Sequence, residues 1–213
     1  MIYKYDSEDK LIVAVDCIIF GFDNEGLKIL LVKRAIKPEI GKWSLMGGFL
    51  KKDETLTASA KRVLKTLTGL ENIYLEQLEA YSEVNRDPAE RTISVAFSAL
   101  LNMVDQKWEL EKSFEAKWFP INAFPVLIFD HNMMVERALK RLRYKAQTQP
   151  QELKLLPKKF TMLQLRTLFE AILDTKLDKR NFTTKINTMN IVKRLDEKDM
   201  SSSKKGSYLY EFL

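Results

Sequence analysis

The chain has 213 residues, of which 46% are hydrophobic and 30% are charged, and its formal net charge is +6. This composition can fill a hydrophobic core and excludes an intrinsically disordered protein, while the length suits one medium domain and one small domain. The single cysteine, Cys17, excludes an internal disulfide and a cysteine-rich zinc site.

The excess positive charge is concentrated in the last third of the chain. Residues 150–213 hold 13 Lys and Arg against 8 Asp and Glu, whereas residues 1–149 hold 22 against 21. This distribution favours a C-terminal part that contacts a polyanion. No apolar run approaches the roughly 18 residues that span a bilayer, and the first residues do not resemble a signal peptide. The sequence therefore predicts a cytoplasmic protein without membrane contact.

The first half of the chain predicts a sheet with an inserted helix. Residues 11–20 form a nearly continuous apolar run, which predicts a buried strand and a buried structural thiol at Cys17. A turn at residues 23–26 leads to a second strand at 27–33. A short strand over residues 43–50 carries the pair Gly47 and Gly48, which permits close approach of other groups to the backbone.

A helix is predicted after this glycine pair, with Asp53 or Thr55 as its N-cap and Gly69 at its C-terminal end. Its apolar residues share one helical face: Leu56, Ala60, Val63, Leu64 and Leu67. Further strands are expected at 75–84 and 92–104, joined by the polar loop 85–91, with an edge strand or turn at 118–121. A second helix over residues 131–145 has a basic outer face that we interpret as a solvated surface. The polar segment 146–152 then predicts a domain boundary.

The last third predicts a winged helix. Thr161 begins a helix over 161–173, and Asp178 caps a second helix over 179–189 whose inward residues are Phe182, Ile186 and Met189. Two helices joined by a tight turn, the second polar and basic outside, are typical of a helix-turn-helix. Strands at 191–195 and 207–212, around a Lys- and Ser-rich tip at 196–206, predict a wing.

The stretch from residue 48 to residue 70 resembles the Nudix signature, G-x5-E-x7-R-E-U-x-E-E-x-G-U, in which U is a bulky aliphatic residue. The matching positions are Gly48, Glu54, Arg62, Leu64, Gly69 and Leu70, while Val63, Thr66 and Leu67 replace the three remaining glutamates. Those glutamates bind magnesium in Nudix enzymes, and Mg²⁺ requires oxygen ligands. Glu54 is expected to form an ion pair with Arg62. The resemblance thus implies a degenerate site with no metal, no catalytic residue and no cofactor.

Longer blocks, at residues 43–50, 86–97, 129–143, 158–161, 177–186 and 208–212, resemble the Nudix-related transcriptional regulators of the NrtR type. The resemblance implies an α+β chain in which a Nudix α/β/α sandwich with a mixed sheet, residues 1–148, precedes a small winged helix-turn-helix domain, residues 149–213. It also implies a homodimer that controls NAD-related or sugar-catabolic genes. Two departures are Met46, where the family often has proline, and Thr183 with Thr184, where it often has basic residues.

The implied function is a ligand-responsive, sequence-specific regulator that binds double-stranded DNA at a near-palindromic operator. The effector would be ADP-ribose or a pentose such as arabinose. A pentose is at least as plausible here, because a diphosphate would have to rely on basic side chains and backbone donors. The alternatives are a Mg-dependent Nudix hydrolase of a nucleoside diphosphate derivative, and a DNA-binding protein whose Nudix domain is purely structural.

Candidate residues for both sites follow from side-chain chemistry. The effector candidates are Trp43, Gly47, Gly48, Arg86, Asp87, Arg91 and His131. Alternatively, Trp43 is a core residue, the two arginines pair with Asp87 and Glu90, and His131 only begins a helix. The DNA candidates are Lys179, Arg180, Asn181, Thr183, Thr184, Lys185, Asn187, Lys193, Arg194, Lys204 and Lys205. Arg180 suits guanine, the asparagines suit adenine, the threonines suit phosphate or a thymine methyl, and Arg194 and the lysines mostly suit phosphates. Alternatively, Lys204 and Lys205 only solubilise a loop.

Overall fold

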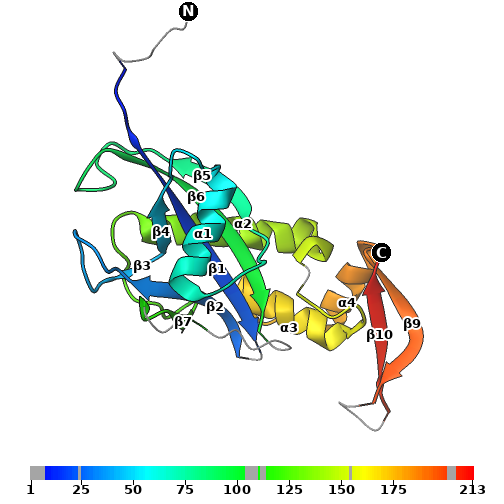
Figure 1. Cartoon of the computed structure of the whole chain (residues 1–213). Helices are drawn as coiled ribbons and strands as arrows, with labels where there is room; N and C mark the ends of the chain where they lie inside the picture. Colours follow the sequence, from blue (N-terminus) through cyan, green and yellow to red (C-terminus); the bar gives the residue numbers. More distant parts are fainter. Residues whose placement is uncertain (1–7, 24, 104–109, 111–113, 154, 201–204) are drawn as a thin grey trace, which may run out of the picture.

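The computed structural model describes residues 8–23, 25–103, 110, 114–153, 155–200 and 205–213. A mixed sheet between two helices is followed by a smaller unit of two helices and a three-stranded sheet (Figure 1). The predicted α+β architecture, a Nudix-like sandwich followed by a winged helix, is confirmed. No helix in the described part of the chain is long and apolar enough to cross a membrane.

The larger sheet has the strand order β3-β2-β1-β6-β5, with β4 paired to β1 and β7 paired to β2. Its long strands β1 and β6 run parallel and its other pairs are antiparallel. The predicted strand over 43–50 is split in two, and the strand predicted over 75–84 is shorter. The strands are β1 (Ile12–Asp23), β2 (Gly26–Lys33), β3 (Trp43–Ser44), β4 (Met46–Phe49), β5 (Glu76–Tyr81), β6 (Thr92–Asn102) and β7 (Lys117–Pro120).

Strand β1 is apolar except for Asp16 and the terminal Asp23, because helices cover both of its faces. Cys17 and Ile19 pack in the same core as α1 (Leu56–Thr68), whereas Ile18 and Phe20 pack with α2 (His131–Thr148) on the opposite face (Figure 1). Successive side chains of a strand point to opposite faces, so a strand covered on both faces reads as one apolar run. Cys17 is buried, as predicted, and this burial raises the pKa of its thiol.

Helix α1 begins and ends at residues that satisfy its free backbone groups. The Thr55 hydroxyl accepts a hydrogen bond from the Ala58 N–H at 3.2 Å, which identifies Thr55, and not Asp53, as the N-cap. Gly69 ends the helix in the left-handed region, with φ of 76°, and donates its N–H to the Lys65 carbonyl.

The second unit is a winged helix with its own core, formed by residues such as Phe160, Leu165, Phe169, Phe182 and Ile186. Thr161 and Asp178 cap its two helices, as predicted. Strand β9 continues to Asp199, beyond the predicted end at residue 195, and the short strand β8 was not predicted. The elements are β8 (Phe160–Thr161), α3 (Met162–Leu173), α4 (Lys179–Thr188), β9 (Val192–Asp199) and β10 (Ser207–Phe212).

The two units share a core at their junction. Helix α2 continues to Thr148 and is followed by a 3₁₀ helix, η2 (Pro150–Leu153), so the segment predicted as a polar boundary is largely helical. Leu168 and Ile172 of α3 belong to the same hydrophobic cluster as the inner face of α2. Arg143 of α2 donates from Nε to the Ile172 carbonyl at 3.0 Å. Apolar packing and a hydrogen bond thus join α2 to the second unit.

Candidate ligand cavity and DNA-binding surface

The segment before α1 is held by an ion pair between Glu54 and Arg62, as predicted. Arg62 donates from Nη2 to Glu54 Oε2 at 2.8 Å and to the Phe49 carbonyl at 3.0 Å, which ties α1 to β4. The hydrogen bonds from Arg62 lower the pKa of Glu54 to about 2. Glu54 is therefore an ionised carboxylate that Arg62 already neutralises.

The three residues that replace glutamates of the Nudix signature lie in different surroundings. Val63 is buried, and a Cβ placed on Gly48 would lie 2.6 Å from its Cγ2, so Gly48 lets α1 approach β4. Thr66 is exposed, and the Leu67 side chain lines a cavity beside β4. Among the described residues, no group of three or more His, Cys, Asp and Glu side chains could hold a metal ion.

This cavity, which we call the Asp16 cavity, has a volume of about 220 Å³. Its closed end consists of buried residues, including Asp16, Ser44, Arg86 and His131. Its rim includes the more exposed Lys33, Arg34, Ile36, Phe49 and Asp87. It is lined by Ala14, Asp16, Val32, Lys33, Arg34, Ala35, Ile36, Ser44, Leu45, Gly47, Gly48, Phe49, Leu67, Arg86, Asp87, Thr92, Phe114, Phe129 and His131.

A buried charge cluster surrounds the closed end. Arg86 donates from Nε and Nη2 to the two carboxylate oxygens of Asp130, at 2.9 and 2.7 Å. The Arg86 side chain is 3% exposed and the Asp130 side chain 14% exposed. Arg86 Nη2 lies 3.7 Å from Asp16 Oδ2, which also accepts a hydrogen bond from Ser94 at 2.5 Å. Two carboxylates therefore face one guanidinium, and the pairing of Arg86 with Asp87 considered from the sequence is wrong.

His131 lies at the closed end and is also the first residue of α2. Its Nδ1 accepts a hydrogen bond from the Leu45 N–H at 3.2 Å, so its proton is on Nε2, which lies 3.7 Å from Asp16 Oδ1. Burial lowers the pKa of His131 below its ordinary value, although the nearby Asp16 opposes this shift. His131 is therefore a neutral imidazole whose Nε2–H faces a carboxylate.

The lowered pKa predicts acid sensitivity that can be assigned to one residue, since His131 is the only histidine. Below pH 6.5 the unfolded chain binds this proton more readily than the folded chain, so the free energy of unfolding falls as the pH falls. One proton limits the loss to about 1.4 kcal/mol per pH unit. Urea denaturation of the wild type and of His131→Gln between pH 7.5 and 5 measures this difference. If the free energy of unfolding depended on pH equally in the two proteins, the acid sensitivity could not be assigned to His131.

The sequence candidates divide into two groups. Gly47, Gly48, Arg86, Asp87 and His131 line the cavity. Trp43 instead packs edge-on against Phe119, with ring centroids 4.8 Å apart, and Arg91 donates to the Glu83 carbonyl at 3.2 Å. Neither of these two residues lines the Asp16 cavity.

Sequence reasoning missed Asp16 and Asp130. Asp16 is an acidic residue inside the apolar run of β1, and this unusual position was a signal for a buried site. A Cβ placed on Gly47 would lie 2.5 Å from Asp16 Oδ1, so the glycine makes room for this carboxylate. Asp130 directly precedes α2, which suggests a helix cap, yet its side chain makes no capping bond and pairs with Arg86 instead.

The outer face of α4 is polar and basic. The exposed candidates on it are Lys179, Arg180, Asn181, Thr184, Lys185 and Asn187, while Phe182 and Ile186 are buried. Thr183 is half-buried and donates its hydroxyl to the Lys179 carbonyl at 2.8 Å. Its hydrogen is therefore not available to a phosphate, and the methyl group remains for contact with a thymine.

The wing carries a stacked pair of cations. Arg194 and Lys198 of β9 lie over the ring of Tyr208 of β10, at 4.6 and 4.8 Å from its centroid. Lys193 and Lys205 are exposed. Lys204 lies outside the residues that the structure describes. Cation–π contacts with one aromatic ring thus hold two exposed cations on the wing.

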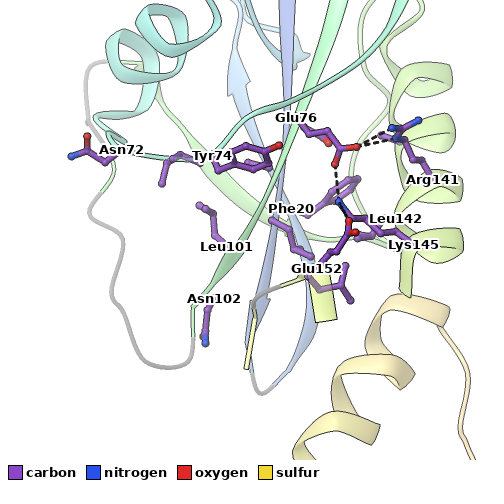
Figure 2. A pocket seen from close by; sticks show the side chains of 16 residues that line it. Phe20, Asn72, Tyr74, Glu76, Leu101, Asn102, Arg141, Leu142, Lys145 and Glu152 are labelled. Carbon is purple, nitrogen blue, oxygen red and sulfur yellow. Dashed lines mark hydrogen bonds and ion pairs between the residues drawn. The ribbon is translucent and has the colours of Figure 1, made fainter. Parts of the chain in front are cut away.

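A second cavity, of about 660 Å³, lies between α2 and β6 near the junction of the two units. Figure 2 shows Glu76 of β5 between Arg141 and Lys145 of α2 at its polar side. Lys145 also pairs with Glu152 of η2 at 3.2 Å. The basic face of α2, interpreted from the sequence as solvated, is therefore partly paired with β5 and η2.

Comparison with known proteins identifies both units. The family model "NUDIX domain" matches residues 10–142, and the model "NrtR DNA-binding winged helix domain" matches residues 152–212. Among curated proteins, the "ADPR responsive transcriptional repressor NtrR" of Acinetobacter baylyi is 31% identical over 214 residues. This alignment covers 99% of the chain and 85% of the relative.

Two solved structures of one relative are also similar. NrtR of Shewanella oneidensis complexed with a 27mer DNA has a TM-score of 0.75 and 27% identity, and the match covers 94% of this chain and 93% of the other. The NUDIX domain of the same protein, complexed with ADP ribose, has a TM-score of 0.57 and 32% identity. That match covers 66% of this chain and 94% of the other.

Proposed function

Because this chain belongs to the NrtR family, with a NUDIX domain and an NrtR winged helix domain, we propose that it is an ADP-ribose-responsive transcriptional repressor. The winged helix would bind a specific operator, and the NUDIX domain would bind the effector. The relative from Acinetobacter baylyi is named as ADPR-responsive and as a repressor. The related structures from Shewanella oneidensis contain DNA in one case and ADP ribose in the other.

The observation that supports the proposal is that α2 extends from the Asp16 cavity to the winged helix. The helix starts at the Asp16 cavity with His131, and Asp130 immediately before it pairs with Arg86. Its C-terminal half packs on α3 of the winged helix and bonds to Ile172. A ligand changes DNA affinity only if it binds two arrangements of the protein unequally. Since α2 contacts both the Asp16 cavity and α3 of the winged helix, a ligand that shifts the start of α2 would also shift the DNA-binding unit.

ADP-ribose is the preferred effector because the relatives' names carry it and do not name a sugar. The rim of the Asp16 cavity includes two cations, Lys33 and Arg34, that could contact a diphosphate. Lys33 would exchange its ion pair with Glu115, whereas Arg34 is held by a hydrogen bond from Nε to the Pro38 carbonyl. From the sequence alone, a pentose is at least as plausible an effector as ADP-ribose. The test therefore includes pentoses as a second set of ligands.

A gel shift on the DNA upstream of the gene and of its neighbours tests the proposal. We expect a sequence-specific shift that ADP-ribose weakens by about 5-fold to 150-fold, the usual range of coupling between two sites. D-ribose and L-arabinose are the parallel arms, and a scrambled sequence of equal length is the control. Retention of scrambled DNA as strong as that of the operator would refute the DNA-binding part. A specific shift that no ligand changes would leave only the structural-domain alternative.

The proposal includes a homodimer in the cytoplasm on a near-palindromic operator. A two-fold dimer presents two copies of α4, so the half-sites should lie about one helical turn, roughly 34 Å, apart. Sedimentation of the free protein and of the complex with operator DNA measures the stoichiometry directly. One chain per operator in the complex would contradict this part of the proposal.

The same proposal excludes efficient diphosphate hydrolysis. Magnesium needs several oxygen ligands, whereas Val63, Thr66 and Leu67 occupy the glutamate positions and Glu54 is engaged by Arg62. We expect incubation of ADP-ribose with the protein and Mg²⁺ to release AMP no faster than buffer alone, with an active ADP-ribose pyrophosphatase as the positive control. Metal-dependent AMP release near 1 s⁻¹, about the lower end of common enzyme rates, would restore the hydrolase alternative.

A further inference from the structure

The wing carries a tyrosine whose ring contacts two cations. Tyr208 of β10 is 42% exposed. The guanidinium carbon of Arg194 lies 4.6 Å from its ring centroid, and the Nζ of Lys198 lies 4.8 Å from it. Both cations belong to β9 and both are exposed; we call the three residues the Tyr208 cation group. Because like charges repel, two cations at one exposed ring point to a negatively charged partner.

An irregularity of the hairpin brings the two cations to one ring. Strands β9 and β10 pair antiparallel, with Lys198 opposite Tyr208 and Arg194 opposite Tyr210. The register shifts between these two pairs, so that β9 carries residues 195–197 where β10 carries a single residue. Such a bulge bends its strand and changes the direction of its side chains. Two cations four positions apart in β9 therefore meet at the same residue of β10.

The Tyr208 cation group continues the face of the hairpin that packs on the helices. Val192 and Phe212, at the base of the hairpin, pack against the core that α3 and α4 share. Arg194 follows Val192 by two positions, and residues two apart in a strand share a face. Strand β9 begins shortly after α4 ends, so the hairpin flanks α4 (Figure 1). A duplex that holds α4 in its major groove would have its backbone beside this face.

The ring positions the two cations without neutralising them. Glu197, the acidic neighbour of Lys198, instead accepts hydrogen bonds from the Nζ of Lys159 at 2.6 and 2.7 Å. An aromatic ring attracts a cation through its quadrupole and carries no net charge. Arg194 and Lys198 therefore keep their full charge for an anion, which an ion pair with a carboxylate would not allow.

We propose that Tyr208 is a positioning residue for DNA binding, whose ring holds Arg194 and Lys198 in place for phosphates of the DNA backbone. Long basic side chains lose rotamer freedom when they bind, and contact with the ring removes part of that freedom beforehand. Phosphate contacts carry no sequence information, so the effect should be similar on any duplex. The inference rests on DNA binding by the winged helix, as in the proposed function.

Fluorescence anisotropy of the full-length protein, with operator and scrambled duplexes, tests the role of the ring. Tyr208→Leu should weaken binding to both duplexes by about 3-fold to 10-fold, because the cations lose their support. Tyr208→Phe keeps a ring and should stay within about 2-fold of the wild type. Tyr144→Leu, at an exposed tyrosine of α2 outside the winged helix, is the matched control and should change neither affinity. Circular dichroism verifies that each variant is folded.

A variant without the two cations tests whether Tyr208 acts through them. Replacing Arg194 and Lys198 together with glutamine should lower the slope of log K against log salt by about 2, since each phosphate contact contributes about 0.9. In that background, Tyr208→Leu should cost no further affinity, because the ring has no cation left to position. An undiminished further loss would overturn the proposal, since Tyr208 would then act by itself.

Three other results would also overturn the proposal. One is an unchanged salt slope in the glutamine variant, which would show that the two cations contact no phosphate. Another is an equal loss for Tyr208→Phe and Tyr208→Leu, which would assign the effect to the hydroxyl group. The third is wild-type affinity of Tyr208→Leu in the otherwise unchanged protein.

The inference and the proposed function fail in different measurements. The effect of the ring is also measured on scrambled DNA, so it can be confirmed in a protein without operator preference or response to ADP-ribose. Conversely, specific and ligand-responsive binding that Tyr208→Leu leaves unchanged would keep the function and overturn the inference. Absence of binding to either duplex by the wild type would refute both.

Discussion

Replacing Arg86 with methionine is expected to lower the free energy of unfolding by about 3–5 kcal/mol, because it leaves a buried carboxylate without its cation. Arg86 is 3% exposed and forms both short bonds to Asp130, while Asp16 lies 3.7 Å away. Methionine fills similar space, so lost charge pairing and not a large cavity would cause the effect. Such a loss is a large fraction of the 5–15 kcal/mol typical of folded proteins. Urea denaturation measures it.

Two further variants separate charge from packing. Arg91→Met, on the same loop, removes an arginine that bonds only to the Glu83 carbonyl in the described structure, and should cost about 1 kcal/mol or less. Adding Asp130→Asn to Arg86→Met should recover about 1 kcal/mol or more, because one unpaired charge disappears. If Arg86→Met lost no more stability than Arg91→Met, the buried cluster would not have the electrostatic role assigned to it.

The features predicted correctly from the sequence are local ones. The sequence predicts Thr161 and Asp178 as caps, and Thr55 as one of two candidates, because a cap bonds to a backbone N–H within three residues. The pairing of Glu54 with Arg62 also joins residues that are only eight positions apart along the chain. The nearly continuous apolar run of β1, interrupted by Asp16, predicted a buried strand because polar and apolar residues do not alternate along it.

The features that escaped prediction depend on long-range packing. Arg86 is one residue from Asp87 but pairs with Asp130, 44 residues away, because α2 places that carboxylate beside the loop. A sequence shows the charge of Arg86 and not which oppositely charged residue the fold brings near. The sequence left Trp43 open between a ligand contact and a core residue, and the pairing of β2 with β7 places Phe119 beside it. Such neighbours follow from strand order, which single-sequence patterns specify poorly.

Replacing Arg180 with alanine is expected to weaken operator binding by about 10-fold to 100-fold, the loss of one bidentate contact to a guanine. Arg180 is exposed in the first turn of α4, and residues near the start of a recognition helix reach the base edges. Binding to scrambled DNA should change far less, because phosphate contacts remain from Lys179 and Lys185. Fluorescence anisotropy with both DNAs at one salt concentration measures the two affinities.

The variant Lys140→Ala is the control that distinguishes lost base recognition from a general loss of positive charge in Arg180→Ala. Lys140 is an exposed cation on α2, so its removal changes the net charge equally without altering α4. An equal loss for both variants, on operator and on scrambled DNA alike, would indicate a general electrostatic effect and contradict base reading by Arg180. A loss confined to the operator would instead assign sequence recognition to α4.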